Sequence, residues 1–233
     1  MEFLSARAVD FDSINVQEDP EGLKLLFSLG PRTTPVVSKG TDYTFGQNTR
    51  QVADFLGLNL DHTPLPPEKL VEKLDMVLAA TQRMVVQIPV EHKEENVRNR
   101  KRTYRVLTHH MPRIAEAFLE AVEEGVFYTP ELPTRPPGDD IQSFGQIADY
   151  AGQVRRRLAD WWKNLDDKSC KWTVETYYGS QAAHDLLERT TWHTAQHVRQ
   201  IMLSLEGWGI EPDGRITMDD LAGLPMPEKA WDD

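Results

Sequence analysis

Two histidines stand four residues apart in the stretch "TTWHTAQHVRQ" (190–200), at His193 and His197. On a helix, residues four apart lie on one face about one turn from each other, so both imidazoles can point at one spot. Neutral imidazoles bind zinc, iron, nickel or copper, and a catalytic site usually adds a third protein ligand and an open position. The spacing therefore indicates a metal site, although such a pair can also be core or surface histidines hydrogen-bonded to their neighbours.

A second pair of histidines, His109 and His110, offers the third ligand. It lies in the pattern "TYRVLTHHMPRIAEAFLEAV" (103–122), whose apolar stripe includes Val106 and Ile114. His110 shares this stripe and is expected to face the interior, whereas His109 lies about a quarter turn away. We therefore favour His110 as the third ligand and keep His109 as the alternative.

Several polar residues near the histidines have predicted supporting roles. Gln196 and Gln200 lie on or beside the same helix face as the HxxxH pair and could accept the second ring N–H of a ligand. Arg199 could meet an anionic substrate, but a surface salt bridge is the favoured role. Pro112 removes a backbone hydrogen bond beside His109 and His110, which predicts a kink or bulge there.

The helices that must position these residues occupy the region after residue 68. Apolar residues recur at helical spacing in four long segments, which cover 68–88, 103–122, 143–165 and 181–209. Four amphipathic helices in one region predict a four-helix up-down bundle, so the fold class is mainly α. The proline-rich insert 129–141 is expected to be a loop, and the irregular tail carries apolar residues that could pack along the bundle.

The region before Pro64, Pro66 and Pro67 is shorter, and its pattern predicts both strands and helices. The alternation of "VDFDSINV" (9–16) predicts a strand, and Asp19, Pro20 and Gly30 bracket a predicted helix over 19–30. A hairpin is expected in "TTPVVSKGTDYTF" and a helix over 46–57. We therefore expect a small incomplete α/β segment over 1–58, an extended linker over 59–67, and the helical bundle with its tail over 68–233.

Composition narrows the possible partners. The chain has 233 residues and a formal net charge of −11, so it should repel phosphate backbones, and nucleic acid is not an expected partner. We interpret the basic run "VRNRKRTYRV" (97–106) as a solvated helix face. No run of eighteen apolar residues and no signal-peptide pattern occurs, so we expect no membrane association and a cytoplasmic location. The one cysteine, Cys170, excludes an intramolecular disulfide and is interpreted as an ordinary thiol, although neighbouring lysines could lower its pKa.

The region 68–209 resembles the DinB/YfiT-like superfamily of metal-binding four-helix bundles. The matching stretches are "LTHHMPRIAEAFLEA" and "LLERTTWHTAQHVRQI". In that family a histidine of the second helix and an HxxxH pair of the last helix bind a divalent metal, which implies His110 (or His109), His193 and His197 here. Characterised relatives include mycothiol-dependent maleylpyruvate isomerase and bacillithiol transferases, in which the metal is thought to activate a thiol. The resemblance implies a divalent transition metal (zinc, nickel, iron or manganese) as cofactor.

The region 2–57 resembles the later part of a glutaredoxin. The stretch "TTPVVSKGTDYTFGQNTRQVADFLG" matches the segment that holds the cis-proline of that family, which falls on Pro35. The resemblance implies glutathione as a possible cofactor. Its peptide backbone would be contacted by Thr34, Pro35 and Val36, and one of its carboxylates by Gln47 and Asn48 at a helix start.

This segment departs from the glutaredoxin pattern at its beginning. The first strand and the CPYC-type motif are absent, so thiol–disulfide exchange through a protein CxxC pair is excluded in this chain. The predicted strand over 9–16 would lack its neighbour and expose backbone groups. Either the true start lies upstream, or another chain or segment supplies the strand, or this part is loosely folded.

Three classes of function follow. The leading hypothesis is a metal-dependent transferase or isomerase in which the metal activates a low-molecular-weight thiol, with glutathione favoured, towards an electrophilic substrate. The alternative is a non-catalytic thiol- or metal-binding module involved in stress or detoxification. The third is a structural or stress-related protein in which the histidines bind metal incidentally or not at all. A homodimer is possible in each case.

Overall fold

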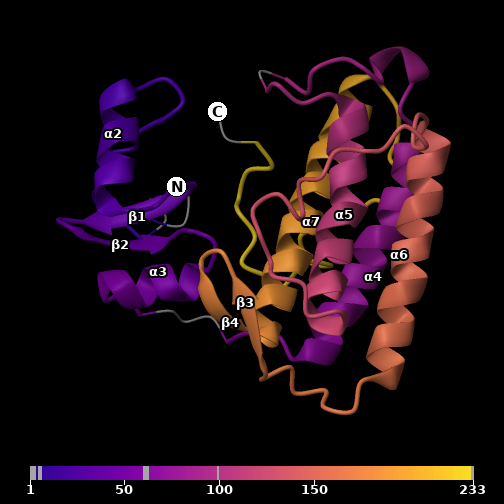
Figure 1. Cartoon of the computed structure of the whole chain (residues 1–233). Helices are drawn as coiled ribbons and strands as arrows, with labels where there is room; N and C mark the ends of the chain where they lie inside the picture. Colours follow the sequence, from indigo (N-terminus) through magenta and orange to yellow (C-terminus); the bar gives the residue numbers. More distant parts are fainter. Residues whose placement is uncertain (1–3, 5–6, 60–62, 99, 232–233) are drawn as a thin grey trace. The chain divides into compact units, whose positions relative to one another are not determined.

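The fold is described from a computed structural model of the chain, covering residues 4, 7–59, 63–98 and 100–231. The chain divides into two compact units, Met1–Thr63 and Pro64–Asp233. Within the described residues the protein is mainly helical, with two small two-stranded sheets (Figure 1). The boundary between Thr63 and Pro64 falls inside the proline-containing segment 59–67, of which residues 60–62 lie outside the description.

Local capping explains both described helices of the first unit. Helix α2, Pro20–Leu29, begins where the Asp19 side chain accepts a hydrogen bond from the Glu21 amide, and it ends at Gly30 with φ of 109°. Helix α3, Thr49–Leu56, begins where the Asn48 side chain accepts from the amides of Arg50 and Gln51.

A β-hairpin lies between these helices. Strand β1, Val36–Lys39, pairs antiparallel with β2, Asp42–Phe45, in the register Val36 to Phe45 and Lys39 to Asp42. The hairpin matches the sequence prediction, and Gly40 supplies the positive φ of 64° that the turn requires.

The predicted strand over 9–16 is wrong, since no strand is present there. A methyl group of Ile14 instead lies against Gly22 of α2, so close that an added Cβ would come within 2.2 Å of it. An isolated extended segment leaves its backbone groups unpaired, and no strand of the described residues lies beside this one. The alternating pattern is compatible with a strand, but a strand also needs a neighbouring strand to pair with, and a local pattern does not show whether one exists.

Four long helices pack side by side in the second unit (Figure 1). They are α4, Pro67–Val85; α5, Tyr104–Glu123; α6, Phe144–Asn164; and α7, Ala183–Gly207. Helices α4 and α5 each pack against both α6 and α7. Thr103 caps α5, and Ser143 with Gln146 forms a capping box at the start of α6.

The directions of these helices differ from the alternating up-down order that the sequence predicts. Glu116 of α5 lies beside Tyr150 of α6, and about two turns further along both helices Glu123 lies beside Arg157. Helices α5 and α6 therefore run in the same direction, because both positions advance together. The proline-rich connection between them is long enough to return the chain along the helices, which a short connection could not do.

A short hairpin leads directly into α7 and was not predicted from the sequence. Strand β3, Thr173–Thr176, pairs with β4, Gly179–Ala182, and Gly179 adopts a φ of 100° at the turn. These strands have only four residues each and a polar composition, so they carry little periodic signal.

The basic run 97–106 was interpreted as a helix face, but helix α5 begins only at Tyr104. A short 3₁₀ helix, Val90–His92, is followed by irregular chain in which the Val97 amide donates to the Arg102 carbonyl at 2.8 Å. Thr103 explains the difference. Its side chain caps the start of α5, so most of the basic residues of 97–106 precede the helix.

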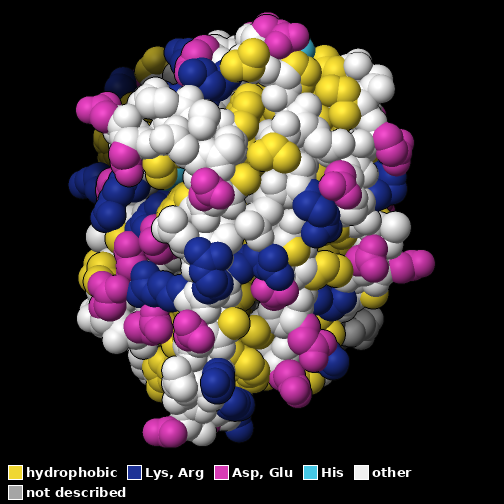
Figure 2. All heavy atoms as spheres, turned by 90° about the vertical axis from the view of Figure 1, so that its right-hand side faces the viewer, with side chains coloured by type: hydrophobic (Ala, Val, Ile, Leu, Met, Phe, Trp, Pro, Cys, Tyr) yellow, Lys and Arg dark blue, Asp and Glu magenta, His cyan; other side chains and the backbone are white. Residues whose placement is uncertain are grey.

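The core of the second unit is apolar and its surface is mixed in charge. Leu70, Leu74, Ile114 and Phe118 are fully buried. Figure 2 shows acidic and basic side chains interspersed on the face turned to the viewer. None of the described helices is both long and apolar enough to cross a membrane.

Candidate metal centre

Three histidines from two helices converge in the second unit. One ring nitrogen from each of His110, His193 and His197 lies within 4.8 Å of the others. The ring centroids of His193 and His197 are 4.9 Å apart. The His110 centroid lies 5.5 Å from that of His193 and 5.2 Å from that of His197. Two ligands of a tetrahedral zinc ion lie about 3.4 Å apart, so small side-chain rotations bring these nitrogens to coordination distance.

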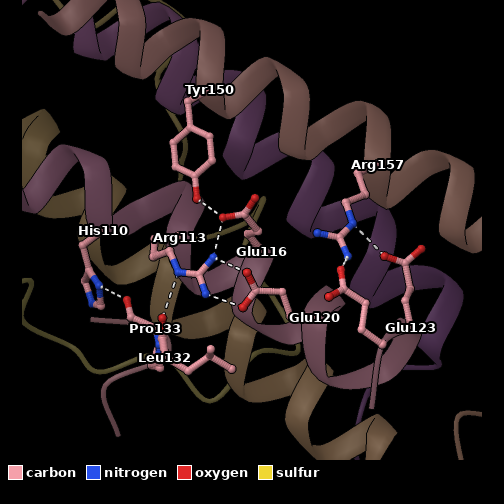
Figure 3. A network of polar contacts seen from close by, with 10 residues as sticks. His110, Arg113, Glu116, Glu120, Glu123, Leu132, Pro133, Tyr150 and Arg157 are labelled. Carbon is pink, nitrogen blue, oxygen red and sulfur yellow. Dashed lines mark hydrogen bonds and ion pairs between the residues drawn. The ribbon is translucent and has the colours of Figure 1, made fainter. Parts of the chain in front are cut away.

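His110 is oriented by the proline-rich connection between α5 and α6. Its Nδ1 lies 2.7 Å from the carbonyl oxygen of Pro133 (Figure 3). A carbonyl can only accept, so Nδ1 must carry the proton and donate. The lone pair is then on Nε2, which is the tautomer that a metal ligand requires.

His197 is oriented by Gln200, one turn later on α7. The His197 Nδ1 lies 2.8 Å from Oε1 of Gln200, and Nε2 of Gln200 donates at 2.8 Å to the carbonyl of Ala230. Because the Ala230 carbonyl must face the amide nitrogen, the amide oxygen faces the imidazole. His197 therefore also donates from Nδ1 and keeps its Nε2 lone pair.

Two ring nitrogens of the cluster are buried without a hydrogen-bond partner among the described residues. They are Nε2 of His197 and Nδ1 of His193. Buried polar atoms are nearly always satisfied in folded proteins, because an unpaired one costs about 1–3 kcal/mol. Such atoms, on three converging imidazoles, fit a bound cation.

The protonation state of the cluster suits a metal. Burial, the neighbouring His197 and the charge of Arg189 hold the pKa of His193 well below its usual range. Burial, then the charges of Arg102 and Arg100, lowers the pKa of His197 to about 4 against the opposing effect of Gln200. Burial likewise holds the pKa of His110 far below its ordinary value. All three imidazoles are therefore neutral at pH 7 and can donate a lone pair.

His109, the alternative third ligand, lies outside the cluster. Its ring stacks on Tyr150 of α6 at a centroid distance of 5.2 Å. Burial, followed by the charge of Arg113, lowers its pKa to about 4. The geometry therefore places His110 rather than His109 with the HxxxH pair.

One turn after His110, a buried arginine holds the same connection. The Arg113 side chain is 2% exposed and its Nε donates at 2.8 Å to the carbonyl of Leu132 (Figure 3). Its other nitrogens bind the carboxylates of Glu116 and Glu120, and the Tyr150 hydroxyl donates to Glu116. Arg113 and His110 thus bind successive carbonyls of the connection, which fixes the backbone that orients His110.

Polar residues of α7 hold the C-terminal tail. Gln196 donates to the carbonyls of Lys229 and Ala230, and Arg199 donates to those of Pro227 and Glu228. The predicted histidine-supporting role therefore falls on Gln200 alone, while Gln196 and Arg199 bind the backbone of the tail. The surface salt bridge favoured for Arg199 stays a prediction beside these carbonyl contacts.

The predicted thiol-contacting residues of the first unit lie close to one another. Thr34 and Pro35 are joined by a cis peptide bond and are exposed. The Gly46 amide donates at 2.8 Å to the Pro35 carbonyl, and Nε2 of Gln47 lies 3.4 Å from the Thr34 carbonyl. Val36 begins the paired strand β1. The Asn48 side chain caps α3, so its amide oxygen is already used within the protein.

Cys170 is unsuited to act as a nucleophile. Its side chain is buried. Burial, together with the negative charge of Asp167, raises the pKa of the Cys170 thiol to about 11. The neighbouring lysines do not produce the lowered pKa that their position in the sequence could suggest.

Two arginines near the histidines were not recognised in the sequence. Arg189 precedes His193 by four residues on α7, and Arg102 precedes His110 by eight. The charge of each lowers the pKa of both His110 and His193. The spacing of four residues along one helix face was the available signal.

Comparisons with family models, curated proteins and solved structures find no match to this chain. The chemistry of the site must therefore be argued from its own residues.

Proposed function

We propose that the second unit is a metal-dependent enzyme of the DinB/YfiT-like four-helix-bundle type that uses a low-molecular-weight thiol in a transferase or isomerase reaction. The observation that carries this proposal is the convergence of His110, His193 and His197 with buried ring nitrogens that lack partners. Three neutral imidazoles suit zinc, nickel and iron, whereas manganese prefers oxygen ligands and is the weakest fit of the four metals considered.

The protein's own part in this chemistry is to present lone pairs in fixed directions. The Pro133 carbonyl and Gln200 hold the protons of His110 and His197 on Nδ1. Three protein ligands leave an open position in a tetrahedral site. A divalent ion in such a site lowers the pKa of a thiol that it coordinates, which supplies a thiolate at neutral pH.

The thiol has to come from a cofactor. Cys170 is the chain's only cysteine, and it is buried with a pKa raised to about 11. A protonated buried thiol neither attacks an electrophile nor binds a metal. An external thiol is therefore the nucleophile that the proposal requires.

Glutathione is the thiol that the first unit favours, through its resemblance to a glutaredoxin. The exposed segment around Thr34 and Pro35 would offer backbone groups to the peptide of glutathione. The amino end of α3, beside Gln47 and Asn48, would favour a carboxylate, because helix amino termini attract anions.

Cobalt substitution tests this function directly. The protein is loaded with Co²⁺, and absorption spectra are recorded as glutathione or its S-methyl derivative is added. The proposal is supported by a thiolate-to-cobalt charge-transfer band that appears with glutathione but not with its S-methyl derivative, and that is lost in His193→Ala. A cobalt spectrum that does not change with glutathione contradicts thiol activation. A thiolate band without conversion of any electrophile in a screened panel would favour the non-catalytic binding module.

A further inference from the structure

We propose that residues 227–231 form a strap whose docking on helix α7 is coupled to metal binding at the three histidines. The inference rests on the metal centre of the proposed function and adds a means of regulating it. Three observations carry it: the hydrogen bonds between the strap and α7, the glutamine that the strap shares with a histidine, and the surroundings of Trp231.

Side chains of α7 hold the backbone of the strap. Four successive carbonyls accept hydrogen bonds from this helix, those of Pro227, Glu228, Lys229 and Ala230. Arg199 binds the first two at 2.6 and 2.7 Å, and Gln196 binds the last two at 3.0 and 2.8 Å. Residues 227–231 form neither helix nor strand. An irregular segment held in this way can open without unfolding the helices beneath it.

Gln200 joins the strap to the metal centre. Its Nε2 donates at 2.8 Å to the Ala230 carbonyl, and its Oε1 lies 2.8 Å from Nδ1 of His197. With the strap docked, the amide oxygen therefore faces the imidazole, and the His197 lone pair is on Nε2. Release of the strap removes the acceptor that fixes the amide, so both the amide and the tautomer of His197 can change. Docking thus favours the form of His197 that binds a metal.

The coupling acts in both directions. A metal on Nε2 of His197 keeps the ring proton on Nδ1, and this proton holds the Gln200 oxygen towards the ring. The amide nitrogen then faces the Ala230 carbonyl, which favours the docked strap. Two equilibria that are linked in this way change each other by the same factor.

The surroundings of Trp231 indicate that docking is balanced. The side chain is buried, and the guanidinium groups of Arg98 and Arg100 lie 4.9 and 6.0 Å from its ring centroid, which favours docking. The indole Nε1, however, is buried without a hydrogen-bond partner among the described residues, which opposes docking. Opposing contributions of this kind leave an equilibrium that a bound metal can shift.

The first arm of the test measures zinc affinity in full-length protein by competition with a chromophoric chelator. Trp231→Ala and Arg199→Gln are two independent strap variants, and each is also combined with Gln200→Ala. Trp162→Ala, which removes a half-buried tryptophan of α6, is the matched control. Thermal unfolding is recorded for each protein.

The second arm measures docking of the strap by electron paramagnetic resonance, without and with zinc. A nitroxide is attached to the thiol introduced by Lys229→Cys on the exposed part of the strap, in the wild-type and strap-variant backgrounds. Cys170 is buried, so the introduced thiol is the reactive one. Gln153→Cys on the exposed face of α6 carries the control label.

We expect each strap variant to mobilise the label at residue 229 and to weaken zinc binding about tenfold, with Trp162→Ala unchanged. In the Gln200→Ala background the strap variants should cause no further loss. Zinc should reduce the mobile fraction at residue 229 in the strap variants and leave the control label unchanged.

Equal zinc affinity in a variant whose label has become mobile overturns the proposal, as do losses that add to that of Gln200→Ala. A label that no variant mobilises shows that residues 227–231 are not a releasable strap. A wild type that takes up no zinc instead disproves the metal centre on which the inference rests.

Discussion

At the scale of single residues, the site depends on a chain of hydrogen bonds that begins outside the histidines. The Ala230 carbonyl fixes the Gln200 amide, and that amide fixes the proton of His197. Partners of this kind orient metal-binding imidazoles and raise their basicity. The described part of the C-terminal tail therefore helps to orient a histidine of the candidate metal site.

Gln200→Ala should weaken metal affinity by about 10–100-fold, because His197 loses the acceptor that fixes its tautomer. Competition with a chromophoric chelator measures this affinity. Gln153→Ala, an exposed residue of α6, is the matched control and should leave it unchanged. Equal affinities in all three proteins would show that Gln200 has no role in the site.

The histidines also predict how the metal-free protein responds to acid. The pKa of His109 is about 4 in the folded protein and about 6.5 when unfolded, so the unfolded state takes up the proton first as pH falls. Stability is therefore full above pH 7 and is lost towards pH 4. We expect a loss of about 2 kcal/mol from this histidine between pH 7 and 5.

Urea unfolding at these two pH values, with chelator present, measures the loss. In His109→Gln, which cannot titrate, the difference between pH 7 and 5 should shrink by that amount. The hypothesis fails if wild type and variant lose equal stability.

At the scale of elements, α5 carries both His110 and the arginine that holds the connection opposite it. Arg113→Ala would leave the Glu120 carboxylate and the Leu132 carbonyl without their shared partner. We expect it to destabilise the protein by about 3–5 kcal/mol, as loss of one member of a buried ion pair does. Arg157→Ala, whose pairs with Glu123 and Glu124 are more exposed, should cost less than about 1 kcal/mol.

Urea midpoints of the two variants, measured at pH 7, decide this prediction. Similar small effects would mean that the network of Arg113 does not hold the connection. A second readout is the metal affinity, which should fall in Arg113→Ala because the backbone that orients His110 loses its anchor.

Local patterns were sufficient for the helices and for the triad. Asp19 caps α2 as its position in the sequence indicates, and Asn48 lies at the start of α3 as expected. The HxxxH spacing and the apolar stripe of α5 correctly predicted the cluster of His193, His197 and His110. Both patterns extend over only one or two helical turns, so they can be recognised in the sequence. Helix α5 continues through Pro112, and the kink or bulge expected beside it stays a prediction.

Contacts between residues far apart in the chain could not be predicted from the sequence. The bond between Gln200 and Ala230 joins residues 30 positions apart, and nothing near either residue signals it. The parallel directions of α5 and α6 follow from pairs such as Arg157 with Glu123, which only the folded chain brings together. The strand expected over 9–16 failed for the same reason, since pairing depends on a distant neighbour.

At the scale of the whole molecule, the proposed metal chemistry and the proposed thiol binding lie in different units of one chain. The second unit holds the three imidazoles and the buried Cys170, and the first holds the exposed segment around Pro35 that we propose contacts a thiol peptide. Because the chain's one thiol is inaccessible, activity should require an added thiol whatever the electrophile.

The most direct test of the central claim is the metal content of the purified protein by elemental mass spectrometry after reconstitution with zinc, nickel, iron or manganese. The wild type and His109→Ala should each hold about one ion per chain, and His193→Ala/His197→Ala should hold none. An ion retained by the double variant, or no ion in the wild type with any of the four metals, would contradict a metal centre at His110, His193 and His197.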